Sequence, residues 1–401
     1  MASIPLSENV SLHTPQILPP GSCLGMLGGG QLGRMFASVA RRMGYHIHIF
    51  GDTPDGPAGQ LSDHTWNASF TDVDQLEQFA AQVDVVTYEQ ENIPVSTVEH
   101  LQTMTRVFPG RELLRMSQHR RLEKSSLNEI GIPTAEFRSV TSAASLVKAT
   151  ADFHGRGILK TATLGYDGKG QIRISPETDL VSAWESLKTD EAILEREISF
   201  DFEISIVAAR FQTGECRFFP PVLNHHVNHI LDLSVSPSPL INPAHCREAE
   251  QIAQAILEHF DVIGVLCVEF FVTTDGRLLV NEIAPRPHNS GHLTIEACPA
   301  SQFEQQVRAV CGWAAGDVRQ LRPAAMANLL GDHLMHTTPE QWSEVFAMND
   351  VHVHLYGKSE SRIGRKMGHL TCLADTARQA EERVLHARSL LTSISRYDTK
   401  P

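Results

Sequence analysis

Residues 265–292 read VLCVEFFVTTDGRLLVNEIAPRPHNSGH, and this stretch has the pattern of a β-hairpin. Two apolar runs flank the dipeptide Asp-Gly at 275–276, which is typical of a two-residue type I′ turn. With that turn, Thr274 pairs with Arg277, and the register of both strands follows by counting back from this pair.

In this register Glu269 lies directly opposite Glu282. Directly opposed residues have Cβ atoms about 5 Å apart on one face of a sheet. Two carboxylates at that separation repel each other, whereas a divalent cation with oxygen ligands, Mg²⁺ or Mn²⁺, removes the conflict. The alternative is a solvated strand face on which the pair is incidental.

The segment after the hairpin is dense in hydrogen-bond donors. These residues are Asn281, Arg286, His288, Asn289, Ser290 and His292. An acidic pair, a metal and a donor-rich loop that can bind anions together predict phosphoryl chemistry.

Length and composition exclude several classes of protein. A chain of 401 residues is too long for one ordinary core, so we expect two or three domains. The net charge of −13 argues against nucleic acid or an anionic membrane as the main partner. Seven scattered cysteines without a C-x-x-C pair favour a reducing, cytoplasmic location. We find neither a long apolar run nor the features of a signal peptide.

Near the N-terminus, residues 23–52 read as a strand, a glycine loop, a helix and a second strand. Gly28, Gly30 and Gly33 match G-x-G-x-x-G, and Asp52 follows about twenty residues on, the pattern typical of NAD binding. The physical basis is a tight turn that aims a helix N-terminus at an anion. A phosphate monoester satisfies it equally well, so both ligand classes stay open at this point.

A third strand, 83–87, leads into Tyr88, Glu89 and Glu91. In a doubly wound α/β domain, ligand groups follow the carboxyl ends of strands. The alternative is an acidic loop that caps a helix at 95–101.

The middle of the chain carries two basic features. The stretch 111–130 reads as one helix, on which Arg120 and Lys124 share a face, either functional or merely solvated. After a short strand with Lys160, the loop 165–170 has three glycines between two strands, and we expect it to close over phosphates.

Three histidines, His225, His226 and His229, suggest zinc at first sight. No carboxylate or cysteine has the spacing that a zinc site requires, so we reject that interpretation. Single contacts from these side chains to a ligand are the better expectation.

The C-terminal part continues with alternating elements. Helices are expected at 301–311 and 376–393. His352 and His354 alternate with apolar residues on a strand, and we expect the histidine face to be solvated. The stretch 364–369, GRKMGH, reads as a basic glycine turn and a second anion site.

Five motifs in this order resemble the ATP-grasp superfamily and, within it, the N5-carboxyaminoimidazole ribonucleotide synthetases. They are GGGQLGRM (28–35), YEQENI (88–93), LK…GYDGKGQ (159–171), VEFFV…LLVNEIAPRPHNSGH (268–292) and GRKMGH (364–369). The resemblance implies an α/β and α+β ATP-grasp fold with a Rossmann-like domain, a small lid and a larger antiparallel-sheet domain. The divisions it implies are 1–20 (flexible extension), 21–118 (Rossmann-like), 119–200 (linker helix and lid), 201–320 (metal and ATP domain) and 321–401 (C-terminal subdomain).

The activity implied by the resemblance is an ATP-dependent carboxylation in purine biosynthesis. ATP, bicarbonate and 5-aminoimidazole ribonucleotide give ADP, phosphate and N5-carboxyaminoimidazole ribonucleotide through carboxyphosphate. ATP and Mg²⁺ are implied, and NAD is not. One alternative is formate-dependent glycinamide ribonucleotide formyltransferase, and an NAD-dependent oxidoreductase is an alternative of a different class.

The resemblance also implies roles for single residues. ATP would contact Arg120, Lys160, Gly165, Gly168, Gly170, Gln171, Glu195, Arg196, Glu197, Ile198, Glu203, His226, Asn281 and Glu282. The ribonucleotide would contact Gly28, Gly29, Gly30, Gln31, Leu32, Glu89, Arg365 and Lys366. Catalysis would involve Tyr166, Asp167, Lys169, Arg286, His288 and Asn289, and the metal would be held by Glu269 and Glu282.

Two positions depart from the family pattern. Strand alternation points Asn281 away from Glu282, and His229 stands where the family usually has glycine. The chain also ends without room for a mutase domain, so we expect a separate mutase partner, and family members are usually homodimers.

Overall fold

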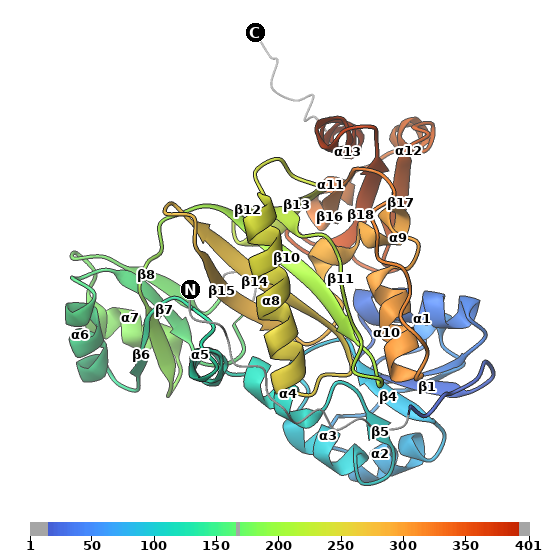
Figure 1. The fold of residues 1–401 in the computed structure, drawn as a ribbon, viewed down its shortest axis with the longest axis horizontal. Coiled ribbons are helices and arrows are strands. Elements are labelled where there is room, and N and C mark those ends of the chain that lie inside the picture. The colour runs from blue at the N-terminus through green and yellow to red at the C-terminus, as the bar shows by residue number, and fades with distance from the viewer. Residues whose placement is uncertain (1–14, 166–168, 393–401) are drawn as a thin grey trace.

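The computed structural model describes residues 15–165 and 169–392, and Figure 1 shows their arrangement. Three sheets organise this part of the chain. The largest lies in the centre, with the N-terminal sheet and a small four-stranded sheet at opposite ends of the view.

The N-terminal sheet is parallel, with strand order β3-β2-β1-β4-β5. Its elements are β1 (Cys23–Leu27), α1 (Gln31–Arg42), β2 (His46–Phe50), η1 (Gly59–Leu61), β3 (His64–Trp66), α2 (Val73–Ala80), β4 (Val85–Tyr88), α3 (Val95–Leu101) and β5 (Arg106–Val107). The doubly wound, Rossmann-like prediction is confirmed. The apolar side of α1 packs on β1 and β2, which places the glycine loop at the carboxyl end of β1.

The expected helix over 111–130 is wrong, because two helices occupy this stretch. These are α4 (Arg111–Ser117) and α5 (Arg120–Glu129). At the break, the amide of Gln118 donates to the carbonyls of Glu91 and Ile93. The backbone of Arg120 bonds instead to Ala162. The break thus ties the start of α5 to the small sheet, while both helices still pack on the core beside β15 through Leu113, Met116 and Leu127.

The small sheet is antiparallel, with order β6-β9-β7-β8. Its elements are β6 (Phe137–Val140), α6 (Ala143–Asp152), β7 (Gly157–Thr161), β8 (Gln171–Ile174), α7 (Leu180–Leu187) and β9 (Ala192–Glu195). Both helices pack against the sheet around a core of their own. We call this unit the lid.

The central sheet is antiparallel and runs β15-β14-β10-β12-β13-β16-β18-β17, with β11 beside β10. Its strands are β10 (Phe200–Arg210), β11 (Cys216–Phe218), β12 (Val222–Val227), β13 (Ile230–Ser236), β14 (Gly264–Thr273), β15 (Leu278–Ala284), β16 (Ala324–Leu330), β17 (Val351–Leu355) and β18 (Lys366–Leu373).

Two helices cover the two faces of β10 and β14. Helix α8 (Pro243–His259) packs on Ile204, Ile206 and Val268 of one face. Helix α10 (Gln302–Val310) lies over Val207 and Cys267 of the other. Helix α10 also packs against α1, so it joins the N-terminal domain to the sheet.

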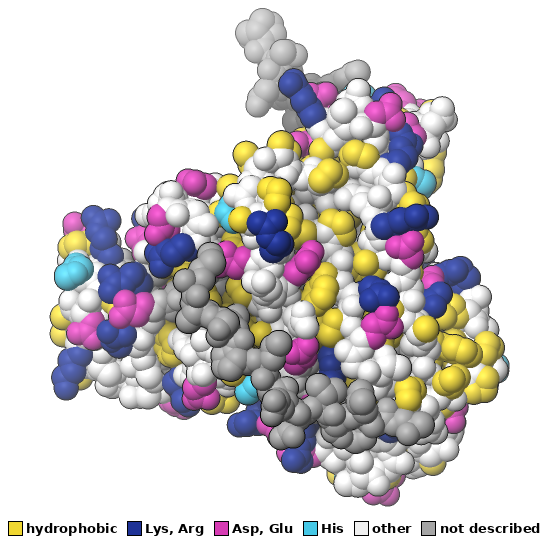
Figure 2. Space-filling view, viewed as in Figure 1, with side chains coloured by type: hydrophobic (Ala, Val, Ile, Leu, Met, Phe, Trp, Pro, Cys, Tyr) yellow, Lys and Arg dark blue, Asp and Glu magenta, His cyan; other side chains and the backbone are white. Residues whose placement is uncertain are grey.

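The remaining elements lie in the C-terminal part and after the hairpin. They are η2 (Asn289–Gly291), α9 (Thr294–Ala297), α11 (Gly331–Leu334), α12 (Pro339–Phe346) and α13 (Ala377–Leu391). Leu18, in the segment before β1, is buried and its N–H bonds to Cys311. No helix in the described ranges is long and apolar enough to cross a membrane. On the coloured part of the face in Figure 2, acidic and basic side chains are interspersed.

Two sequence expectations for the C-terminal part are corrected. The stretch 364–369 is a turn only up to Arg365, because Lys366 already begins β18. The histidine face of β17 is solvated at His352, as predicted, but not at His354. His354 stacks on His369 with ring centroids 4.4 Å apart and bonds to Glu296 at 2.7 Å.

Candidate functional site

The predicted hairpin forms from β14 and β15, but its turn is one residue longer than the Asp-Gly signal predicts. Thr273, not Thr274, pairs with Arg277, and Gly276 adopts φ +80°. Left to itself, this longer turn would shift the register. A β-bulge between Glu269 and Phe270 restores it.

Glu269 therefore lies directly opposite Glu282, as predicted. The bulge also revises the expectation for Asn281, which is the extra residue on β15. Because a bulge sets two residues against one, simple alternation no longer holds there. Asn281 and Glu282 both line the same cleft.

The cleft has a volume of about 1100 Å³ and draws its walls from the N-terminal domain, the lid and the central sheet. Most of the predicted site residues meet there. They are Gly30, Gln31, Leu32, Glu89, Arg120, Lys160, Gly165, Lys169, Gln171, Glu195, Glu203, His226, Glu269, Asn281, Glu282, Arg286, His288, Asn289 and Lys366.

The two opposed carboxylates have opposite pKa shifts. Burial and the charge of Glu269 raise the pKa of Glu282, whose side chain is nevertheless open to the cleft. Burial also opposes ionisation of Glu269, but the adjacent His288 lowers the pKa of Glu269 to about 2. A divalent cation with oxygen ligands would relieve the repulsion, so this donor set fits Mg²⁺. No group of three or more His, Cys, Asp or Glu suited to a metal occurs among the described residues, so phosphate oxygens would have to complete the coordination.

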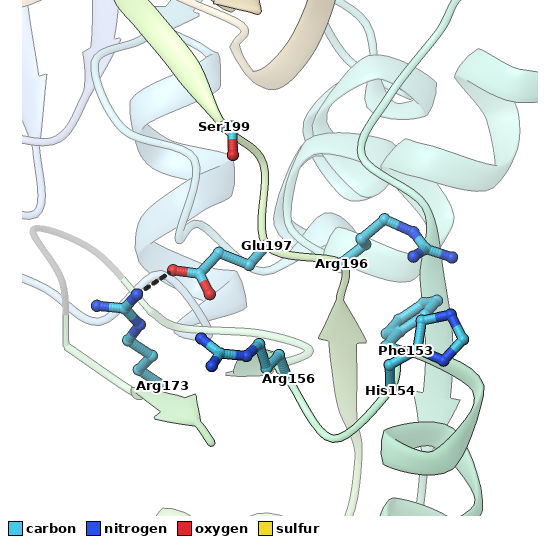
Figure 3. A pocket seen from close by; sticks show the side chains of 7 residues that line it. All are labelled: Phe153, His154, Arg156, Arg173, Arg196, Glu197 and Ser199. Atoms are coloured by element: carbon cyan, nitrogen blue, oxygen red, sulfur yellow. Dashed lines mark ion pairs between the residues drawn. The ribbon is translucent and has the colours of Figure 1, made fainter. Parts of the chain in front are cut away.

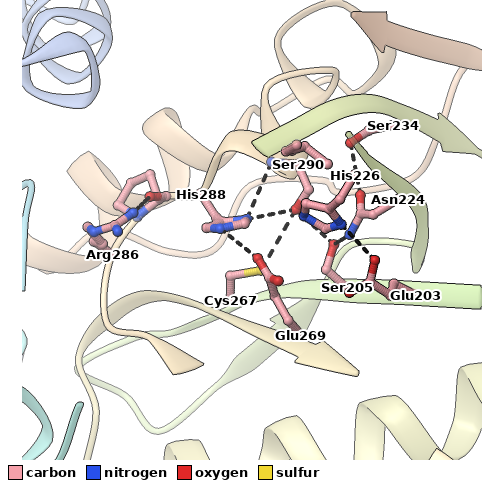
Figure 4. Close-up of polar contacts among 12 residues, drawn as sticks. Glu203, Ser205, Asn224, His226, Ser234, Cys267, Glu269, Arg286, His288 and Ser290 are labelled. Carbon is pink, nitrogen blue, oxygen red and sulfur yellow. Dashed lines mark hydrogen bonds and ion pairs between the residues drawn. The ribbon is translucent and has the colours of Figure 1, made fainter. Parts of the chain in front are cut away.

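His288 lies beside Glu269, and Arg286 lies two residues earlier on the same loop (Figure 4). His288 Nε2 lies 2.8 Å from Glu269 Oε1. Burial disfavours the charged ring, but Cys267 and Glu269 raise the pKa of His288 to about 10. Arg286 Nε lies 2.5 Å from Glu91 Oε2, which ties it to the N-terminal domain. These donors and the carboxylates form a charged end of the cleft, in which Glu269 is buried and Glu282 is exposed.

A second cluster of cations lies where α5 meets the lid. Lys160 Nζ lies 2.8 Å and Lys124 Nζ 3.2 Å from the Glu195 carboxylate. Arg120 donates to the carbonyls of Thr161 and Gly165 at 2.9 and 2.8 Å. A Cβ at Gly165 would lie 2.8 Å from this guanidinium and 2.9 Å from the Lys169 carbonyl oxygen, so a larger residue would have to displace one of them. Three cations at one edge of the cleft suit a polyphosphate.

The glycine loop of the N-terminal domain holds a carboxylate of the chain itself. Glu89 accepts from the N–H groups of Gly30 and, at 2.7 Å, of Gly33 at the start of α1. This is the place that a dinucleotide pyrophosphate takes in an NAD site. Asp52 packs over Gly29 and accepts from Gly59 N–H at 3.1 Å, which holds the following loop. The geometry thus disfavours the dinucleotide interpretation.

His226 on β12 and His229 in the β12–β13 turn both line the cleft. His226 Nδ1 lies 2.7 Å from Glu203 Oε2, and Glu203 raises the pKa of His226 against the effect of burial. Asn228 and His229 form the turn with φ +50° and +65°. His229 lies 3.3 Å from Gln171 of the lid.

Family models match three consecutive parts of the chain. They are the ribonucleotide synthetase preATP-grasp domain at 22–118, the ATP-grasp domain at 125–303 and the phosphoribosylaminoimidazole carboxylase C-terminal domain at 324–383.

Curated relatives narrow the assignment. N5-carboxyaminoimidazole ribonucleotide synthase from Brucella melitensis is 42% identical over 356 residues, which cover 88% of this chain and 97% of the relative. The chain belongs to the N5-carboxyaminoimidazole ribonucleotide synthase family. A bifunctional purine synthesis protein, purC/E, from Dictyostelium discoideum is 41% identical, but the matched residues span only 37% of its length.

Solved structures of the N5-carboxyaminoimidazole ribonucleotide synthase family share the fold. An ADP complex of the synthetase is 38% identical with a TM-score of 0.88, and the match covers 94% of this chain and 98% of that one. The synthase from Aspergillus clavatus, in complex with ADP and 5-aminoimidazole ribonucleotide, is 29% identical with a TM-score of 0.83. That match covers 93% and 99% of the two chains.

Not every residue suggested by the family resemblance lines the cleft. Gly28, Gly29, Gly170, Ile198 and Arg365 do not, and Tyr166, Asp167 and Gly168 lie outside the described residues. The side chains of Arg196 and Glu197 line a separate pocket of about 460 Å³ on the lid (Figure 3). There Glu197 pairs with Arg173, and Arg196 lies over the ring of Phe153.

The cleft is also lined by residues that the sequence interpretation did not include as site residues. Glu123 and Lys124 are buried where α5 meets the cleft, and no periodic signal separates such a face from a solvated one. Phe200 and Phe271 line the cleft with stacked rings 4.6 Å apart. Glu91 follows a strand end, which marked it as a possible ligand, but its partner Arg286 is not apparent from the sequence.

Proposed function

We propose that this chain catalyses the ATP-dependent carboxylation of 5-aminoimidazole ribonucleotide with bicarbonate, giving N5-carboxyaminoimidazole ribonucleotide, ADP and phosphate. The observation that carries the proposal is the opposed pair Glu269 and Glu282 beside Arg286 and His288, in a cleft that also reaches the N-terminal glycine loop. The names of the relatives identify the same product.

The chemistry proceeds in three steps. A bicarbonate oxygen attacks the γ-phosphorus of ATP, the bond to ADP breaks, and carboxyphosphate forms. Carboxyphosphate then divides into CO₂ and phosphate. The exocyclic amine of the ribonucleotide attacks CO₂ and loses a proton, which leaves the carbamate.

ATP would lie between the lid and the central sheet. Its phosphates would contact Arg120, Lys160 and residues 165 and 169–171 of the glycine-rich loop. Lys124 lies beside them. The stacked rings of Phe200 and Phe271 offer an apolar surface of suitable size for the base. Because the side chains of Arg196 and Glu197 line the other pocket, those two residues could reach ATP only through their main chain.

Glu269 and Glu282, with Asn281 adjacent, would hold Mg²⁺, or Mn²⁺ in its place. When bound, such an ion neutralises charge on the transferring phosphoryl group. Arg286, His288 and Asn289 would bind bicarbonate and stabilise the charge that develops on it, because buried donors act strongly there.

The ribonucleotide would occupy the end of the cleft between the N-terminal domain and β18. The glycine loop and Glu89 border this region, and Lys366 reaches it from β18. Lys358 adds a further cation, since its Nζ donates to the Lys366 carbonyl at 2.6 Å. A basic group of this kind suits the ribonucleotide phosphate.

Three further predictions concern the oligomeric state of the protein, its location in the cell and its partner enzyme. We infer a homodimer, a cytoplasmic location and a separate mutase that consumes the unstable product. The divisions after residues 118, 200 and 320 likewise remain predictions.

The deciding experiment measures ADP release by the purified protein with Mg²⁺-ATP, bicarbonate and 5-aminoimidazole ribonucleotide, omitting each in turn. We expect release only with all components present and transfer of labelled bicarbonate into an acid-labile product. Turnover driven by formate and glycinamide ribonucleotide would keep the ATP-grasp chemistry but replace the substrate. NADH binding without any ADP release would overturn the proposal.

A further inference from the structure

A chain of buried polar side chains runs through the central sheet to His288 (Figure 4). Its members are Ser234 on β13, Asn224 on β12, Ser205 on β10 and Ser290 in η2, and each is at most 3% exposed. Neighbouring strands otherwise fill this face with apolar side chains. Four polar groups there need a compensating reason, because burying them costs free energy unless every one is bonded.

The hydrogen bonds along this series of side chains all donate in the same direction, from Ser234 toward His288. Ser234 Oγ donates to Asn224 Oδ1 at 2.9 Å, and Asn224 Nδ2 donates to Ser205 Oγ at 2.8 Å. Since Ser205 accepts from an amide, its own hydrogen goes to Ser290 Oγ, 2.8 Å away. The hydrogen of Ser290 is then left for the next acceptor.

That acceptor is His288 Nδ1, 2.9 Å from Ser290 Oγ. The backbone N–H of Ser290 points at the same nitrogen from 3.3 Å. The other neighbour, Cys267 Sγ, is 3.9 Å from the hydroxyl. Two donors of one residue thus converge on Nδ1, and Nδ1 can accept from them only while it carries no proton. The ring proton then lies on Nε2, which faces Glu269 at 2.8 Å. The charged ring that Glu269 favours would have to give up both contacts at Nδ1, so the geometry at Ser290 opposes it.

We propose that Ser290, held by Ser205, Asn224 and Ser234, is a positioning residue that keeps His288 Nδ1 as an acceptor and Nε2–H directed into the bicarbonate end of the cleft. In the structure Glu269 accepts this Nε2–H, and bicarbonate would take its place as the acceptor when the Glu269 carboxylate binds the metal. The inference deepens the proposed function, because it rests on His288 contacting bicarbonate or carboxyphosphate. Side chains that orient metal-ligating histidines typically contribute 10- to 100-fold to metal affinity or activity, and we expect an effect of the same order here.

The first test asks which nitrogen of His288 matters. A glutamine places its amide nitrogen near the position of Nε2, and an asparagine places it near Nδ1. We therefore expect His288→Gln to keep at least about tenfold more kcat/KM for bicarbonate than His288→Asn. Equal activities, or a better asparagine variant, would overturn the donor role.

The second test is a double-mutant cycle on kcat/KM for bicarbonate, with ATP and ribonucleotide saturating. Ser290→Ala should lower it about 10- to 100-fold in the wild type, while KM for ATP changes less than twofold. In the His288→Gln background, which has no Nδ1, the same change should cost less than twofold. An equal loss in both backgrounds would show a merely structural serine and overturn the inference.

Two further variants guard against misfolding. Ser205→Ala removes the side chain that holds Ser290, without a direct contact to His288. It should also lower kcat/KM for bicarbonate. Ser236→Ala is the matched control, since Ser236 is equally buried on β13 but bonds to Gln320 at 3.0 Å, away from His288. It should stay within twofold of the wild type in kcat/KM, and a loss equal to that of Ser205→Ala would contradict the proposal. If ADP release proves independent of the ribonucleotide, the proposed function fails whatever these serines do.

Discussion

Glu91 of the N-terminal domain and Arg286 of the loop after β15 form an ion pair that joins the two regions across the cleft. Burial opposes both charges, yet Arg286 lowers the pKa of Glu91, and Glu91 raises that of Arg286. The proposed ribonucleotide and bicarbonate ends of the cleft thus share one fixed guanidinium.

Glu91→Gln should therefore lower kcat/KM for bicarbonate about 10- to 100-fold, because Arg286 loses the group that orients it. The free energy of unfolding should fall by about 1–3 kcal/mol, since a largely buried cation is left without its partner. Steady-state kinetics and urea unfolding measure the two effects. Asp261→Asn is the control, as it breaks the pair with the buried Arg210 outside the cleft and should leave the kinetics unchanged. Unchanged bicarbonate kinetics in Glu91→Gln would remove this pair from the site.

Glu282→Gln should abolish turnover, by at least about 100-fold, while the fold persists. The change removes the repulsion from Glu269, so the metal-free variant should melt no lower than the wild type. Mg²⁺ should raise the melting temperature of the wild type but not of the variant, because only the wild type binds the ion tightly. Glu215→Gln, a change at a partly exposed carboxylate that pairs with Arg217 beside β11, is the control and should behave as the wild type. Retained Mg²⁺-dependent turnover in Glu282→Gln would exclude the metal role.

The sequence predicted correctly that Glu269 lies opposite Glu282, although the turn from which the register was counted is wrong. The turn is one residue longer than Asp-Gly predicts, and the bulge at Asn281 shifts the register back by the same amount. Two local departures cancel, so counting from the wrong turn gave the right pair. The same bulge explains why alternation failed for Asn281.

The contacts that organise the rest of the site are long-range and have no periodic signature. Ser205 and Ser290 are 85 residues apart, and Glu91 and Arg286 are 195 apart. The sequence pattern located the glycine loop and the strand that ends near Glu89. It could not show that Glu89 occupies the helix N-terminus, because that depends on how β4 lies beside β1.

Lys366→Ala should raise KM for the ribonucleotide at least about tenfold, as a lost charged hydrogen bond to phosphate costs about 1.5–3 kcal/mol. KM for ATP should change little, because Lys366 approaches the cleft from β18, the side opposite the lid. Arg362→Ala, an exposed neighbour paired with Glu360, is the control and should leave both constants unchanged. An equal increase for both substrates would place Lys366 outside the ribonucleotide site.

Burial and the nearby Arg365 lower the pKa of Lys358 to about 8. The ammonium is therefore lost as the pH rises through 8, so KM for the ribonucleotide should increase above that pH. Lys358→Arg should flatten this increase, because arginine stays charged. Measuring KM from pH 7 to 9.5 tests it, with Lys148→Arg on the lid surface as the control. A KM that rises equally in wild type and Lys358→Arg would assign the pH dependence to another group.

The pH dependence of stability should reveal Glu123. Burial raises the pKa of Glu123 to about 8, with Lys124 opposing and Glu282 adding to the effect. The folded state thus keeps a proton that the unfolded state releases above its ordinary pKa of 4.5, so the free energy of unfolding falls between about pH 5 and 8 and then levels off. In this pH window, the free energy of unfolding of Glu123→Gln relative to that of the wild type should increase by on the order of 1 kcal/mol per pH unit. Urea unfolding across pH 5.5–8.5 measures it, and the exposed Glu129→Gln on the same helix should leave the slope unchanged. A constant difference between Glu123→Gln and wild type would show that this carboxyl is ionised in the folded protein.

His229 occupies a turn position with φ +65°, where the family resemblance leads us to expect glycine. A histidine there is strained, because its Cβ crowds the backbone, whereas the short polar side chain of an asparagine, as at Asn228, can hydrogen-bond locally in the same region. His229→Gly should therefore raise the free energy of unfolding by about 0.5–1 kcal/mol, while Asn228→Gly should change it by only a few tenths.

His229→Gly also removes the contact between His229 and Gln171 that joins this turn to the lid. KM for ATP should consequently rise a few-fold in His229→Gly, with KM for the ribonucleotide unchanged. Thermal melting and steady-state kinetics on both glycine variants separate the two effects, since only one of them loses the contact to the lid. A His229→Gly protein that is no more stable than the wild type would contradict the strain, and one with unchanged KM for ATP would show that the contact does not hold the lid.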